Sequence, residues 1–142
     1  CMIPRLPRFL PDPSSAASDV YKRHLQSVGP YRYAPPADQI AAFGELAAAG
    51  AAAVSGSQGH HAQGFAFENG AFIHYGLGNL FFDQMDMLAT RQSFVDTYVI
   101  YDGRLLSVEL WTGLIENWAR PRLMTPEERA DLLQTVFSAS RW

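Results

Sequence analysis

Two adjacent histidines and two glutamines lie in one short glycine-containing stretch of the chain, which reads Gly56-Ser57-Gln58-Gly59-His60-His61-Ala62-Gln63. Imidazole nitrogens and carboxamide oxygens are groups that bind metal ions and phosphates. In an extended segment Gln58 and His60 would face one side, and His61 would face the other. A polar turn whose histidines bond to nearby carbonyl groups explains the same residues. The spacing alone favours that simpler alternative, because a lone histidine pair is weak evidence for a metal site.

The elements around this stretch predict an α/β scaffold. Small apolar residues at 51–55 predict a buried strand, and a helix is predicted from residue 36 to about residue 49. Residues 64–68 and 71–75 alternate in polarity around Asn69-Gly70, which predicts a β-hairpin because both turn positions require a positive φ. A loop between a buried strand and a hairpin is where such scaffolds usually hold their chemistry.

The two ends of the chain contribute further predicted elements. Residues 20–26 have helical spacing and predict a short helix ending near Gly29, with His24 in a structural role. The short aromatic run at 31–33 predicts a strand or a loop that covers another part of the molecule. Thr125 and Glu128 form a capping-box pattern with proline between them, which predicts a helix to about residue 138.

Between the hairpin and that last helix we expect a loop at 84–93, strands at 94–101 and 104–111 joined by a turn at Asp102-Gly103, and an extended segment at 121–124. The acidic residues of this region are predicted to be solvated or in turns, and its two tryptophans to be core or lid residues. The acidic residues are Asp96, Asp102 and Glu109, and the tryptophans are Trp111 and Trp118.

Asn79 is a second candidate for the site. It follows Gly76-Leu77-Gly78, whose two glycines permit a tight bend or a close approach of two backbone segments. No third glycine opens a helix after it, so a dinucleotide-binding fingerprint is rejected. An Asx turn explains Asn79 as well as a role in a site does.

Composition limits the classes of function. The 142 residues are 48% hydrophobic and 18% charged, which is typical of one folded domain. A formal net charge of −3 argues against a nucleic-acid partner, and no apolar run is long enough for a transmembrane helix. The only cysteine is Cys1, so no internal disulfide forms, and a chain beginning there is expected to be a fragment or a cleavage product; a lipidated amino-terminal cysteine is the alternative.

With both polar segments in view, the chain resembles the CapA-type family of capsule (poly-γ-glutamate) synthesis proteins, whose members are similar to calcineurin-type metallophosphoesterases. The resemblance is clearest over residues 36–84, and two motifs carry it. They are Gly50-Ala51-Ala52-Ala53-Val54-Ser55-Gly56-Ser57-Gln58-Gly59-His60 with Gln63, and Phe72-Ile73-His74-Tyr75-Gly76-Leu77-Gly78-Asn79-Leu80-Phe81-Phe82-Asp83-Gln84. The family pattern is an αβ unit ending in Gly-x-His-x-His, then a hairpin, then a strand entering a Leu-Gly-Asn bend.

The resemblance implies an α/β fold in which residues 1–142 form the C-terminal half of a calcineurin-like metallophosphatase sandwich, with β-hairpins and flanking helices. By position, His60 matches a metal-ligating histidine with a catalytic role. Gln58 replaces the other histidine of the motif, and would ligate or orient a hard ion such as Mn²⁺ or Mg²⁺ better than Zn²⁺. Asn79 matches the asparagine of the bend, beside the catalytic centre, and would contact substrate together with His61 and Gln63.

The family also uses an aspartate and an Asn-(His/Glu) motif on earlier strands, and neither occurs before the loop, since the first asparagine is Asn69. The resemblance therefore implies a hydrolase that needs a missing N-terminal segment to complete a centre containing a divalent metal (Mn, Fe, Zn or Mg). The substrate would be an anionic polymer or a phosphoester. The alternative is a non-catalytic envelope protein that binds or assembles capsule polymer. Either places the chain in the bacterial cell envelope, outside the cytoplasm, with its missing segment or a second copy as partner.

Overall fold

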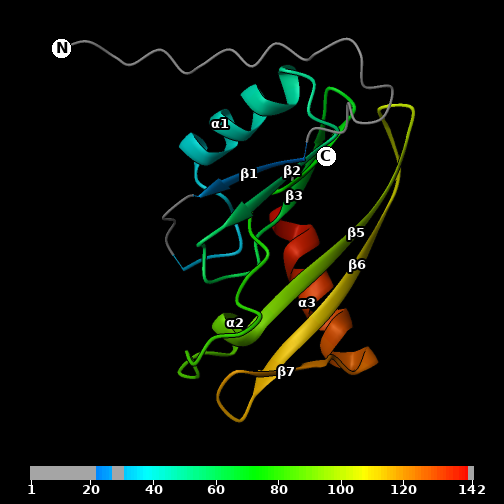
Figure 1. Cartoon of the computed structure of the whole chain (residues 1–142). Helices are drawn as coiled ribbons and strands as arrows, with labels where there is room; N and C mark the ends of the chain where they lie inside the picture. The colour runs from blue at the N-terminus through cyan, green and yellow to red at the C-terminus, as the bar shows by residue number, and fades with distance from the viewer. Residues whose placement is uncertain (1–21, 27–30, 141–142) are drawn as a thin grey trace, which may run out of the picture.

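The computed structural model describes residues 31–140 and the backbone of residues 22–26. The described strands are β1 (Lys22–Gln26), β2 (Ala53–Ser57), β3 (Phe65–Glu68), β4 (Ala71–His74), β5 (Gln92–Tyr101), β6 (Arg104–Glu116) and β7 (Arg120–Leu123), and the helices are α1 (Ala37–Ala48), α2 (Leu88–Arg91) and α3 (Pro126–Ala139). Figure 1 shows α1 beside the sheet that contains β1 to β4, and α3 beside the long ribbon of β5 and β6. This mixed content confirms the predicted α/β class.

The first sheet has the strand order β1-β2-β4-β3. Strands β1, β2 and β4 are parallel, and β3 pairs with β4 in the antiparallel sense. The turn between β3 and β4 has φ values of 51° at Asn69 and 79° at Gly70, so the predicted hairpin is confirmed. Helix α1 connects two parallel strands and covers one face of the sheet, as a parallel pair requires.

The helix predicted over residues 20–26 is wrong. Residues Lys22–Gln26 form β1, in register with Ala53–Ser57 of β2, while residues 20 and 21 lie outside the described part of the chain. The helical spacing of a seven-residue stretch is weak local evidence, and pairing with the open side of β2 outweighs it. His24 therefore lies in a strand, opposite Ser55.

The second sheet consists of β5, β6 and β7 in that order. Asp102-Gly103 forms the turn between β5 and β6, as predicted, and the ribbon is irregular between Val99 and Ile100. The loop predicted at 84–93 is partly wrong, because its end forms α2 and the first residues of β5. Strand β6 also continues beyond the predicted residue 111 as far as Glu116.

Two apolar clusters fill the two sides of the first sheet. The cluster under α1 includes Phe43, Val54, Ile73 and Tyr75. The cluster on the opposite face joins the sheet to β5 and α3 and contains Phe65, Phe72, Phe94, Leu132 and Val136. The strand β4 supplies residues to both clusters, because its successive side chains point to opposite faces.

The capping box at the start of α3 is confirmed. The Thr125 hydroxyl accepts from the Glu128 backbone N–H, and a Glu128 carboxylate oxygen accepts from the Thr125 N–H at 2.8 Å. Arg122 of β7 also donates to both oxygens of that carboxylate. These bonds, from Arg122 first and then Thr125, lower the pKa of Glu128 to about 2 and tie the helix to the second sheet.

Of the two roles predicted for the tryptophans, the core role is wrong, and the lid role stays a prediction. The exposed fraction is 45% for Trp111 and 71% for Trp118. Trp111 lies on the outer side of β6, and Trp118 lies in the turn between β6 and β7, where its φ is 58°. Apolar residues at alternate positions indicate a strand. They do not show which face of the strand is covered by the rest of the protein.

Gly56 is the position where the first sheet tolerates no side chain. A Cβ there would collide with the carbonyl group of Tyr75. We expect Gly56→Ala to lower the free energy of unfolding by about 3 kcal/mol, the upper part of the range for overpacked sites. Urea denaturation measures the change. The matched control is Gly44→Ala in α1, where the nearest atom is the end of the flexible Glu68 side chain, at 3.0 Å, and a helical alanine is favoured over glycine. Equal stabilities of the two variants would contradict this packing.

Candidate functional site

The loop after β2 is held in an unusual backbone conformation. Gln58 and His60 both have positive φ, 68° and 45°, although neither is glycine. Residues other than glycine adopt this left-handed region rarely, and such strained positions concentrate where a side chain must be placed for function. The prediction that Gln58 and His60 face one side assumed an extended segment. The loop is not extended at these two residues, so that assumption fails.

His60 and Asn79 lie against each other. The Nδ1 atom of His60 is 2.9 Å from the Oδ1 atom of Asn79, although the two residues come from different loops. The Nδ2 group of Asn79 donates to the carbonyl oxygen of Thr90 at 2.9 Å, which fixes the orientation of the carboxamide. Oδ1 only accepts, so the proton of a neutral His60 ring lies on Nδ1. The other ring nitrogen, Nε2, then carries the free lone pair.

Aromatic and amide side chains surround this pair. Tyr31 stacks on the His60 ring with centroids 6.2 Å apart, and Phe82 contacts it at 5.0 Å. Gln84 connects Asn79 with Tyr31, because its Oε1 accepts from Asn79 and its Nε2 donates to the hydroxyl of Tyr31. Sequence reasoning did not name these three residues as site residues. The aromatic run at 31–33, predicted to cover another part of the molecule, was the available signal.

The bend that carries Asn79 depends on Gly78. Its φ is 75°, and a Cβ there would collide with the carbonyl group of Gln92 at the start of β5. The bend therefore lies directly on the second sheet, where Phe94 donates to the carbonyl oxygen of Leu77 at 2.8 Å. A close backbone approach and a positive φ, the two predicted reasons for the glycines, both apply at this position.

The other predicted site residues are not gathered with His60 and Asn79. Gln58 is exposed and makes no side-chain hydrogen bond to another described residue. His61 points inward between Tyr31 and Tyr33, with ring centroids 5.6 and 5.4 Å away. It is 5% exposed, and burial lowers its pKa below the ordinary value. Its backbone neighbour His60 thus faces a different environment.

Gln63 is part of the interior, with 1% of its surface exposed. Its Oε1 accepts from the Nε2 group of Gln39 at 3.1 Å, and that same group donates to the carbonyl oxygen of Tyr75 at 2.6 Å. The Gln63 backbone N–H donates to Gly76 at 2.8 Å. These contacts connect α1, the loop and the end of β4, so Gln63 positions the loop, and its contact with a substrate stays a prediction.

Among the described residues, His60 has the arrangement of an imidazole that could ligate a metal ion. The lone pair on His60 Nε2 and the partner that holds the opposite nitrogen are the arrangement that metal-ligating histidines adopt. Within residues 31–140, however, no three histidine, cysteine, aspartate or glutamate side chains lie close enough together to hold a metal. A complete centre therefore needs donors from outside this part of the chain.

A second polar cluster lies between the two sheets and was not foreseen. The Nδ1 atom of His74 is 2.7 Å from Oδ2 of Asp96, and their side chains are 0% and 2% exposed. The Tyr98 hydroxyl donates to the same Oδ2 at 2.9 Å and lies 2.9 Å from the Ser55 hydroxyl. Burial, and then the Asp96 carboxylate, raise the pKa of Tyr98. The prediction that Asp96 is solvated is wrong; Asp102 and Glu109 are exposed as predicted.

A parallel αβ unit followed by a histidine loop, a hairpin and an asparagine bend defines an α/β protein with its polar loops at one end of the sheet. Residues 14–84, half of the chain, match the family described as bacterial capsule synthesis protein PGA_cap. The chain belongs to that family, as its motifs predicted. A search of curated proteins finds no match to this chain.

The match ends at Gln84, which contacts Asn79 in the structure. Both polar loops of the site, including His60 and Asn79, therefore lie inside the family region. Membership associates the chain with capsule synthesis and with a role at the cell envelope. Among the described residues, no helix is long and apolar enough to cross a membrane.

The burial of His61 predicts a pH dependence of stability. Its pKa is lower in the folded chain than in the unfolded chain, so protonation favours unfolding. This contribution to stability is fully present above about pH 6.5, the ordinary histidine value, and is lost as the pH falls through the folded pKa. We expect His61→Phe, which keeps an aromatic ring between the tyrosines, to flatten the dependence in urea denaturation between pH 5 and 7. Identical slopes for the two proteins would contradict it.

Proposed function

We propose that this chain supplies one wall of a metal-dependent hydrolytic centre that acts on a phosphoester or a related ester in capsular polymer biosynthesis. His60 is the proposed metal ligand, through Nε2, and Asn79 is the residue that orients it. The observation that carries the proposal is the hydrogen bond between His60 Nδ1 and Asn79 Oδ1 at 2.9 Å, with the amide anchored on Thr90. This hydrogen bond leaves the lone pair of His60 Nε2 in a fixed direction. A polar turn exposed to solvent would not need its histidine to be held in this way.

The remaining donors are proposed to come from a segment outside the described residues. A divalent ion such as Mn²⁺, Fe²⁺, Zn²⁺ or Mg²⁺, when bound, would polarise an ester oxygen and lower the pKa of a water molecule. This chain's own contribution is to hold the His60 ring and to limit water around it with Tyr31 and Phe82. Gln58, exposed at the loop tip, is placed to meet a polymer substrate or an incoming ligand.

Metal binding tests this role. The product of the entire gene is titrated with Mn²⁺, beside residues 1–142 alone, and binding is measured by calorimetry. We expect His60→Ala to abolish binding in the entire product, and Asn79→Ala to weaken it by about 10- to 100-fold, the usual effect of removing a partner that orients a ligand. Gln134→Ala, which removes an exposed amide from α3, is the matched control and leaves binding unchanged.

Metal binding that His60→Ala leaves intact would refute the ligand role. If the ion binds as expected while no phosphoester is hydrolysed, the ligand is right and the reaction is wrong. The two halves of the proposal therefore fail separately.

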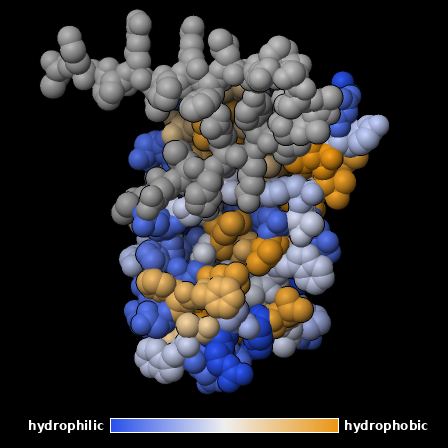
Figure 2. Space-filling model, viewed as in Figure 1, coloured by the Kyte–Doolittle hydropathy of each residue, from blue (hydrophilic) through white to orange (hydrophobic). Residues whose placement is uncertain are grey.

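A second function is favoured by an exposed apolar surface beside the loop. Phe81, Phe82, Met87 and Leu88 are 73%, 42%, 42% and 60% exposed. Figure 2 shows apolar surface on the face where α2 lies in Figure 1. Such a cluster is typical of a binding surface, and it supports a non-catalytic envelope protein that binds capsule polymer or an assembly partner. An extracytoplasmic location, with or without a lipid on Cys1, belongs to both proposals.

Capsule formation distinguishes the two functions. In a capsule-forming host, a catalytic role predicts that His60→Ala stops polymer production, since the proposed ligand is lost. A binding role predicts that Phe81→Ser with Leu88→Ser stops it while His60→Ala does not. Polymer on the cell surface is measured for each variant, with Leu106→Ser, an equally exposed apolar residue at 62% on the distant ribbon, as control.

A further inference from the structure

A cavity of about 290 Å³ lies between the end of the first sheet and β5. Ser55, Asp96 and Tyr98 form its polar part. Its remaining lining residues are Leu77, Gly78, Leu80, Phe94 and Val95. The cavity therefore combines a short polar floor with apolar walls, which is the usual composition of a site for a small organic ligand.

The hydrogen bonds of the polar floor leave one carboxylate oxygen unused. Oδ2 of Asp96 accepts from the Tyr98 hydroxyl at 2.9 Å and lies 2.7 Å from Nδ1 of His74. Oδ1 of the same carboxylate is buried and has no hydrogen-bond partner. A buried carboxylate oxygen without a donor costs free energy, so native structures usually pair it.

The imidazole beside this carboxylate also has an unused nitrogen atom. His74 contributes Nδ1–H to Asp96, while its Nε2 is buried and has no partner. In the described part of the chain, neither lysine nor arginine forms an ion pair with Asp96. Among the described side chains, Oδ1 of Asp96 is thus a buried acceptor that no donor reaches.

We propose that this cavity binds a small organic cation, a primary ammonium group attached to a short apolar chain. The ammonium group donates to Oδ1 of Asp96, the carboxylate oxygen that lacks a donor. The apolar chain lies along Leu77, Leu80 and Val95. Because Oδ1 is enclosed, entry requires a small outward movement of the lining. Val95, 45% exposed, is the wall with the least packing.

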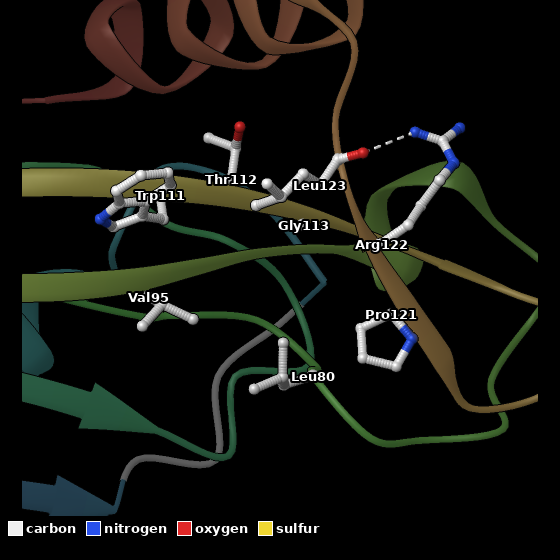
Figure 3. Close-up of a pocket in the computed structure, with 8 residues that line it drawn as sticks. All are labelled: Leu80, Val95, Trp111, Thr112, Gly113, Pro121, Arg122 and Leu123. Carbon is white, nitrogen blue, oxygen red and sulfur yellow. Dashed lines mark hydrogen bonds between the residues drawn. The ribbon is translucent and has the colours of Figure 1, made fainter.

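A neighbouring groove gives the apolar chain room to extend. This groove, of about 220 Å³, shares Leu80 and Val95 with the cavity and continues along Trp111, Pro121 and Leu123. Figure 3 shows the guanidinium of Arg122 turned away from these apolar side chains, toward the Leu123 carbonyl group. The positive charge of Arg122 therefore does not face the groove. The side chains that lead outward from the Asp96 carboxylate along the groove are apolar.

The inference is independent of the proposed hydrolytic centre. Leu77, Gly78 and Leu80 line the cavity, whereas Asn79 of the same bend turns its side chain to His60 and Thr90. The two sites thus share a segment of backbone and use different side chains. Cation binding without metal binding, or the reverse, tells them apart.

The test is a titration of the chain with n-butylammonium chloride, followed by ¹H–¹⁵N NMR. We expect saturable shifts at the amides of Gly78, Leu80 and Val95. We expect 1-butanol, which has the same apolar chain without the charge, to bind at least about tenfold more weakly, because a charged donor to a buried carboxylate is the stronger bond. No saturable shift with butylammonium, or equal affinity for butanol, would overturn the proposal and leave a water molecule as the occupant.

Two variants locate the binding. Asp96→Asn removes the charge and is expected to weaken butylammonium binding at least about tenfold. Asp102→Asn, the same change in the exposed turn of the ribbon, is the matched control and leaves binding unchanged. Because Asp96→Asn also alters the contact between the sheets, Val95→Trp provides a separate test by filling the cavity from its exposed side. Full affinity in a folded Val95→Trp protein, judged by circular dichroism, would refute the site.

Discussion

The hydrogen bond between His74 and Asp96 joins the two sheets at a buried point, and the position of the candidate site depends on it. His74 ends β4, and Asp96 is the fifth of the ten residues of β5. The intervening segment contains the bend with Asn79 and also Thr90, whose carbonyl oxygen holds the Asn79 amide. Once both ends of this segment are attached to sheets, the bend has few positions left. The polar contact at the sheet interface thus orients a side chain that it does not touch.

The hydrogen bond between His74 and Asp96 contributes more to the alignment of the two sheets than to the stability of the fold. Aromatic rings enclose His74, with the centroids of Phe94 and Phe65 at 5.0 and 5.5 Å. Replacing a buried polar pair by apolar residues of similar volume often costs little stability, so this pair is better understood as selecting one alignment of the sheets. Any sliding of β5 by one residue would turn Asp96 outward and leave His74 without a partner.

Local patterns predicted the elements whose determinants are close together in the sequence. Asn69-Gly70 and Asp102-Gly103 specify their own turns, and Thr125 with Glu128 specifies the start of α3. The same reasoning failed for β1. The conformation of these five residues is set by their pairing with the parallel strand β2, which outweighs the periodicity of their own sequence. The family motifs identified both polar loops, and half of the chain matches the family.

The contacts of the site were less accessible to sequence reasoning. Asp96 looked like a solvated strand residue because nothing near it in sequence reveals that His74 faces it across the sheet interface. The hydrogen bond of Gln63 to Gln39 of α1, which lies 24 positions earlier, was equally hidden from the sequence. Both cases concern polar side chains whose partners are distant in the sequence. The functional roles predicted for the site residues stay predictions: these residues are Gln58, His60, His61, Gln63 and Asn79. The adjacency of His60 and Asn79 is a property of the fold.

The turn at Asn69-Gly70 has one more consequence, for the divergence of related chains. Both residues are exposed, and the space around a Cβ at Gly70 is empty to 4 Å. The catalytic candidates leave the sheet at the other end of β3 and β4, so residues added at this tip lengthen the hairpin without moving them. Homologues are therefore free to vary in length here, and a tag or a small inserted domain has a tolerant point of attachment.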